Sequence, residues 1–61
     1  MEVLFEYTQI GAIMKVTAVD AQTGTEVVIQ GPASMPQSVL QRTALTKLRY
    51  VLDKKGKETG R

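Results

Sequence analysis

The chain contains no cysteine, no histidine and no tryptophan. Without cysteine it cannot be held by disulfide bonds, and without cysteine or histidine it lacks the usual ligands of a zinc site. Catalysis in which a histidine activates a serine or cysteine nucleophile is excluded as well. The sequence therefore predicts no catalytic residue, no metal site and no cofactor, and we expect a protein that is not an enzyme.

Long apolar stretches are also missing, since the longest run of apolar residues has three members, as at residues 27–29. A membrane-spanning helix needs about 20 consecutive apolar residues, and a secretory signal needs an apolar stretch near its start. We therefore expect no membrane contact and a cytoplasmic location.

The chain has 61 residues, which is enough for one small domain. The apolar area that so short a chain buries does little more than offset the conformational entropy lost on folding. Because disulfide bonds and metal ions are not available to help, association is the remaining common source of stability. We expect a homo-oligomer, most simply a dimer with two-fold symmetry.

Charge is unevenly distributed along the chain. Residues 1–35 carry four acidic residues and one lysine, whereas residues 36–61 carry seven basic and two acidic residues. This distribution could attract an acidic partner or hold two copies head to tail. It also suits a helix with lysines at its C-terminal end, where the helix dipole is negative.

Residues that favour β-structure predict three strands: residues 3–10, 13–20 and 25–30. Gly11 and Ala12, between the first two, fit a two-residue type II′ turn, which favours glycine at its first position. Such a turn places Ile10 opposite Ile13. It thereby sets the register of the whole hairpin.

A longer turn joins the second and third predicted strands. Asp20 opens this turn, and Gly24 supplies a positive φ near its end. With Asp20 opposite Thr25, the third strand runs antiparallel to the second, and Gly31 with Pro32 closes it. A five-residue loop at this turn would instead exchange the two faces of the third strand. The second strand is then central, and the first and third are edges.

Side-chain alternation sorts the predicted sheet into two faces. The expected core face has no charged residue and consists of Val3, Phe5, Tyr7, Met14, Val16, Ala18, Val27 and Ile29. The other face, called the outer face below, mixes apolar, polar and charged residues: Leu4, Glu6, Thr8, Ile10, Ile13, Lys15, Thr17, Val19, Glu26, Val28 and Gln30.

The second half of the chain predicts one long helix over residues 35 to 54 or 55, with Gly56 as its stop. Ser34 and Gln37 match a capping box, and Pro36 lies in the first turn. Six apolar residues form one stripe along this helix: Leu40, Ala44, Leu45, Leu48, Val51 and Leu52.

These elements predict an α+β fold, in which a three-stranded antiparallel β-meander is followed by one C-terminal α-helix. The apolar stripe of the helix packs on the core face of the sheet, and the order of elements is β-β-β-α. We expect a single domain over residues 1–55 and a flexible basic tail over residues 56–61.

A single helix covers only one face of a sheet, so the apolar residues of the outer face are the predicted interface: Leu4, Ile10, Ile13, Val19 and Val28. Single exposed apolar side chains are common, but five on so small a sheet indicate a patch for self-association. Pairing through the edge of the third strand is a competing dimer geometry. The favoured function is a non-enzymatic protein-interaction module that binds a second copy or another protein.

The alternative function is nucleic-acid binding by the helix and the tail, with candidate phosphate contacts at Arg42, Lys47, Arg49, Lys54 and Lys55. A solvated basic helix end is the simpler explanation of these residues. A sheet that reads bases would need more basic residues on its strands than Lys15. Tyr50, on the flank of the helix, either closes the margin of the core or anchors a partner.

Several short motifs occur together along the chain: Val3-Leu4-Phe5-Glu6-Tyr7, Gly11, Lys15-Val16-Thr17-Ala18, Asp20, Thr23-Gly24-Thr25-Glu26, Gly31-Pro32 and Leu45-Thr46-Lys47-Leu48-Arg49-Tyr50-Val51-Leu52. With them the chain resembles short bacterial proteins of about this length, found mainly in alphaproteobacteria, that carry a domain of unknown function. The resemblance covers nearly the whole chain apart from the tail. It implies a stand-alone cytoplasmic bacterial protein and points to no activity, substrate or cofactor.

Overall fold

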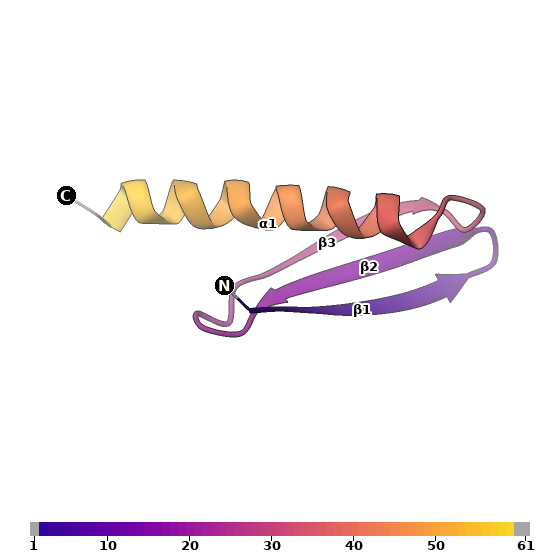
Figure 1. The fold of residues 1–61 in the computed structure, drawn as a ribbon, viewed down its shortest axis with the longest axis horizontal. Coiled ribbons are helices and arrows are strands. Elements are labelled where there is room, and N and C mark those ends of the chain that lie inside the picture. Colours follow the sequence, from indigo (N-terminus) through magenta and orange to yellow (C-terminus); the bar gives the residue numbers. More distant parts are fainter. Residues whose placement is uncertain (1, 60–61) are drawn as a thin grey trace.

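Over residues 2–59, the fold consists of a three-stranded sheet and one helix (Figure 1). This computed structural model describes the backbone of residues 2–59 and the side chains as far as Lys55. The elements are β1 (Val3–Ile10), β2 (Ile13–Asp20), β3 (Glu26–Pro32) and α1 (Gln37–Thr59). β2 lies between β1 and β3, and both pairings are antiparallel. The predicted fold class and the order β-β-β-α are confirmed.

The turn between β1 and β2 sets the register of the hairpin. Gly11 has a φ of +61°, and Ala12 does not have a positive φ. A type II′ turn requires a positive φ only at its first central residue, so this pattern agrees with the predicted turn. Ile10 pairs with Ile13, and the same register continues to the far end of the hairpin. The predicted pairing of β1 with β2 is confirmed.

The turn between β2 and β3 also has the predicted alignment. Val19 pairs with Glu26, and the N–H of Asp20 donates a hydrogen bond of 2.8 Å to the carbonyl oxygen of Thr25. Gly24 has a φ of +77°, a conformation that glycine adopts without steric cost. The side-chain faces of β3 are therefore those that the sequence predicts.

The bounds of β3 differ from the prediction, because the strand begins at Glu26 and continues through Gly31 to Pro32. The N–H of Ala33 donates a hydrogen bond of 2.8 Å to the carbonyl oxygen of Ala12. Because alternate residues of a strand point their backbone groups in opposite directions, the nitrogen of Pro32 faces the free edge of the sheet. Proline costs no ladder hydrogen bond there, so it does not end the strand.

α1 begins later than predicted, at Gln37. The carbonyl oxygen of Pro36 accepts hydrogen bonds from the N–H groups of Val39 at 3.1 Å and Leu40 at 3.3 Å, so the helical ladder starts there. A residue that precedes proline is disfavoured in the helical conformation, which keeps Met35 outside the helix. The prediction of Ser34 as the N-cap is therefore wrong.

α1 also ends later than predicted, since it passes through Gly56 and continues to Thr59. A glycine inside a helix costs only about 1 kcal/mol relative to alanine, which does not oblige the helix to stop. Of the predicted tail, residues 56–59 belong to α1, and residues 60–61 lie outside the described residues. Within residues 2–59, α1 lacks the combination of length and apolar character that crossing a bilayer requires.

α1 lies on the core face of the sheet, along β3 and β2 (Figure 1). The buried core of the described side chains is small and consists of Val16, Ala18, Val27, Leu40, Ala44 and Leu48. Partly buried residues pack around it: Val3, Phe5, Tyr7, Met14, Ile29, Val51 and Leu52. All eight predicted residues of the core face belong to these two groups, and the predicted core face is confirmed. Leu45, at the margin of the helical stripe, is only half-buried.

Contacts with both edge strands, β1 and β3, fix the position of α1. On the β1 side, the hydroxyl of Tyr7 donates a hydrogen bond of 3.1 Å to Oε1 of Gln41. At the end of β3, Gly31 approaches Leu40 so closely that a Cβ on the glycine would lie 2.6 Å from Cδ2 of the leucine. The helix therefore rests directly on the backbone of β3 at this point.

Candidate functional site

The register arranges the outer face in rows that cross the sheet from β1 to β3. From the β2–β3 turn to the Gly11 turn, the four rows are Leu4–Val19–Glu26, Glu6–Thr17–Val28, Thr8–Lys15–Gln30 and Ile10–Ile13–Pro32. They are called the first to fourth rows below. Since α1 packs on the opposite face, these rows face away from the helix.

The five predicted interface residues all lie on the outer face, but at two separate ends. Leu4 and Val19 pair in the first row, and Ile10 and Ile13 pair in the fourth. Val28 lies in the second row, diagonal to Val19. Leu4 is 56% exposed and Ile10 63% exposed. The face thus has an apolar patch at each end, with the polar third row between them.

Charge on the outer face lies mainly between the two apolar ends. Glu6 in the second row and Lys15 in the third are diagonal neighbours on adjacent strands. Glu26 adds a second carboxylate at the β3 side of the first row. Thr17, at the centre of the face, is only 7% exposed because the side chains around it already cover it. The centre of the face is therefore polar and closely packed.

The five predicted phosphate contacts do not share one surface. Lys47 donates a hydrogen bond of 3.0 Å to the carbonyl oxygen of Val28, and Lys55 donates one of 3.3 Å to the hydroxyl oxygen of Thr25. Arg42 and Arg49 are exposed and lie seven residues apart, which places them on one side of α1. Lys54 is exposed as well, but at 100° per residue it points about 140° away from Arg49.

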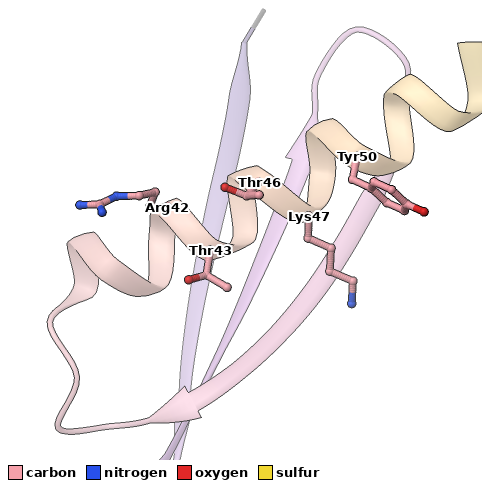
Figure 2. Close-up of a pocket in the computed structure, with 5 residues that line it drawn as sticks. All are labelled: Arg42, Thr43, Thr46, Lys47 and Tyr50. Carbon is pink, nitrogen blue, oxygen red and sulfur yellow. The ribbon is translucent and has the colours of Figure 1, made fainter.

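A shallow, open pocket of about 480 Å³ runs along the flank of α1, lined by Arg42, Thr43, Thr46, Lys47 and Tyr50. Figure 2 shows Lys47 and Tyr50 on the same side of the helix, whereas Arg42 extends away from Lys47. Tyr50 is 66% exposed, so the interpretation that it closes the margin of the core is wrong. Because the pocket is open to water, it offers little of the desolvation that tunes catalytic groups.

A polar cluster at the β2–β3 turn goes beyond what sequence reasoning predicts. The carboxylate of Asp20 accepts hydrogen bonds at Oδ2 from the Thr23 hydroxyl, at 2.7 Å, and from the Thr23 N–H, at 3.2 Å. The Thr23 hydroxyl also lies 2.9 Å from that of Thr25, which accepts the bond from Lys55. The spacing of Asp20, Thr23 and Thr25 is the sequence signal for this cluster.

The hydrogen bonds of the cluster support the turn. Asp20 is only 3% exposed, and among the described residues its Oδ1 has no hydrogen-bond partner. The hydrogen bond from the Thr23 side chain lowers the pKa of the Asp20 carboxyl, and burial partly opposes that effect. Nor do three potential metal ligands come together anywhere in the part of the chain that the structure describes.

Comparison with known proteins adds a family but no activity. No curated protein and no solved structure matches the chain. The family described as a domain of unknown function (DUF6898) matches residues 1–55. Because this match spans the three strands and α1 as far as Lys55, the chain belongs to the DUF6898 family of domains of unknown function.

Proposed function

We propose that this protein is a small non-enzymatic interaction module that self-associates as a homodimer through its outer face. The observation that carries the proposal is the exposure of apolar side chains at both ends of that face, with α1 packed on the other side of the sheet. Paired apolar residues on an uncovered sheet are typical of a surface that binds another protein. A cytoplasmic location and a bacterial origin stay predictions.

The size of the core supports association. Among the residues whose side chains are described, six are buried and apolar, and two of them are alanines, Ala18 and Ala44. Complete burial of a leucine, isoleucine or valine side chain contributes about 1.5–3 kcal/mol. Covering Leu4, Ile10 and Ile13, which are about half-exposed, therefore adds roughly 1 kcal/mol for each of them. A dimer gains this stabilisation in both copies.

The dimensions of the face predict the strength of the dimer. Three strands about 4.8 Å apart, with eight residues at about 3.3 Å each, form a face of roughly 14 by 26 Å. Two such faces bury on the order of 1,000 Å² of accessible surface, which is near the lower limit for a specific interface. We therefore expect a dissociation constant in the micromolar range.

Nucleic-acid binding, the alternative, has less support. Lys47 and Lys55 already donate hydrogen bonds to Val28 and Thr25, and Lys54 points away from the side of α1 that Arg42 and Arg49 share. Affinity for a nucleic acid depends on several cations that reach phosphates on one surface. On the outer face, the carboxylates of Glu6 and Glu26 repel phosphate groups.

The test is sedimentation equilibrium of the wild type and of Ile13→Lys, with Thr46→Lys as the matched control. Ile13 is 44% exposed in the fourth row, whereas Thr46 is exposed on α1 away from the sheet. Burial of an unpaired ammonium in an interface costs several kcal/mol, so Ile13→Lys raises the dissociation constant by at least about 100-fold. Thr46→Lys leaves the dissociation constant unchanged.

Far-ultraviolet circular dichroism of both variants establishes that they are folded, so that loss of association is not confused with unfolding. The proposed function is wrong if the wild type sediments as a monomer at about 500 μM, far above a micromolar dissociation constant. It is also wrong if Ile13→Lys dimerises as tightly as the wild type and the control Thr46→Lys do.

A further inference from the structure

The shape of the outer face limits how two copies can cover it. In a two-fold dimer of stacked sheets, the symmetry axis lies between the two faces and parallel to both. The face is about twice as long as it is wide, so crossing the strands at right angles leaves the ends of both faces uncovered. Strands aligned to within about 30° cover the whole face. The axis then runs either along the strands or across them.

An axis along β2 brings each row against itself and places β1 over β3 of the second copy. Lys15 then faces Lys15 of the second copy, and Leu4 faces Glu26. This arrangement brings two ammonium groups of like charge together at the centre of the interface. It also sets Leu4 against a carboxylate rather than against another apolar side chain. Glu26 faces no hydrogen-bond donor in either arrangement, since the axis across the strands sets it against Pro32.

An axis across the strands, at the level of Val16, gives the opposite result. The first row then meets the fourth row of the second copy, and the second row meets the third. Leu4 packs on Ile10 of the second copy, and Val19 packs on Ile13. Each apolar end of one face is covered by the other apolar end of its partner.

The charges of Lys15 and Glu6 fit this second arrangement as well. Lys15 in the third row lies over Thr17 of the second copy. In the second row of that copy, Glu6 lies beside Thr17. The long lysine side chain reaches this carboxylate, and the two-fold axis repeats the pair. On the basis of the proposed self-association, we infer that the outer faces of two copies stack with antiparallel strands. In this dimer Leu4 meets Ile10, Val19 meets Ile13 and Lys15 meets Glu6.

Cross-linking tests the arrangement directly, because the chain has no cysteine of its own. Leu4→Cys and Ile10→Cys are mixed in equal amounts and treated with a bismaleimide that spans about 8–10 Å, close to the separation of packed sheets. We expect a mixed cross-linked dimer, identified by its mass. The control is a mixture of Leu4→Cys with Glu26→Cys, which the axis along the strands predicts to react.

Lys15→Gln gives an independent readout of the same geometry. In the inferred arrangement it removes two partly exposed ion pairs and weakens the dimer by about fivefold. With the axis along the strands, it removes a repulsion between two lysines and tightens the dimer. Lys54→Gln, on α1, removes the same charge and leaves the dissociation constant unchanged.

The outcomes separate this inference from the proposed function. If the wild type is a monomer, both fail. If Ile13→Lys breaks a wild-type dimer but Leu4→Cys reacts with Glu26→Cys and not with Ile10→Cys, the proposed function stands and the inferred arrangement is overturned. A dimer that neither cysteine mixture cross-links, or that Lys15→Gln tightens, overturns the arrangement too.

Discussion

The ammonium group of Lys47 on α1 donates a hydrogen bond of 3.0 Å to the carbonyl oxygen of Val28 on β3. The N–H of Asp20 donates a backbone hydrogen bond to the carbonyl oxygen of Thr25, just before β3. From Thr25 onward, the backbone groups of odd-numbered residues therefore point to β2, and those of even-numbered residues point to the free edge. Val28 belongs to this second set. A side chain of the helix thus occupies the middle of the edge at which a further strand would add.

Replacing Lys47 by methionine keeps the aliphatic stem but removes the donor. We expect Lys47→Met to lower the free energy of unfolding by about 0.5–1.5 kcal/mol, the usual net contribution of a hydrogen bond. We also expect stronger association through the β3 edge, because the carbonyl of Val28 becomes available. Urea titration measures the first effect and light scattering against protein concentration the second. Unchanged scattering would show that Lys47 does not protect this edge.

The close approach of Gly31 and Leu40 predicts that Gly31→Ala destabilises the fold. An added methyl group forces a buried leucine to move, which costs about 1–3 kcal/mol in a packed core. Leu40→Val removes the atom that clashes, so the double variant should lose less stability than the sum of the two single variants. Denaturant unfolding of the four proteins gives this coupling energy. Additive losses would contradict the steric explanation.

The hydrogen bonds to Asp20 predict a dependence of stability on pH. Because its pKa is lowered below 3.8 in the folded chain, the ionised carboxylate stabilises the fold above that pH. This stabilisation is lost as the pH falls below 3.8 and through the lower pKa of the folded state. Asp20→Asn should therefore lose less stability than the wild type between about pH 5 and pH 2. Urea titrations at a fixed protein concentration compare the two, and equal losses would contradict the prediction.

The scattered cations predict weak binding to nucleic acid. Of the described basic residues, Arg42 and Arg49 are the two placed to reach one duplex together, so the slope of log affinity against log salt should be about −2 or shallower. Fluorescence anisotropy with a random duplex at several salt concentrations measures it. Arg42→Gln combined with Arg49→Gln should abolish the remaining affinity. A much steeper slope would favour nucleic-acid binding as the function.

Much of the fold is predictable because local signals agree with one another. The single glycine at Gly11 fixes a two-residue turn, and this turn determines every pairing of β1 with β2. Asp20 and Gly24 mark the second turn, but a five-residue loop there would exchange the faces of β3, and the observed pairing of Val19 with Glu26 decides between the two registers. Once both registers are set, alternation assigns each side chain to a face, including the five apolar residues of the predicted interface.

Other features depend on interactions that local patterns do not contain. Pro32 belongs to β3 because its nitrogen faces the free edge, and that requires knowledge of which side of β3 pairs with β2. Tyr50 is exposed because α1 lies on β3 and β2 with Leu40 and Leu48 inward, a rotation that the helical stripe defines only approximately. The engagement of Lys47 with Val28 follows from the same placement.

α1 is longer than the sheet on which it packs. Its 23 residues rise about 34 Å at 1.5 Å each, whereas the eight residues of β2 span about 26 Å. The end of the helix extends past the β2–β3 turn, as Figure 1 shows. A fluorophore or affinity tag joined after Thr59 would thus stand clear of the outer face, whereas one joined before Glu2 would begin beside Leu4. Reporters for association belong at the C-terminal end of the helix.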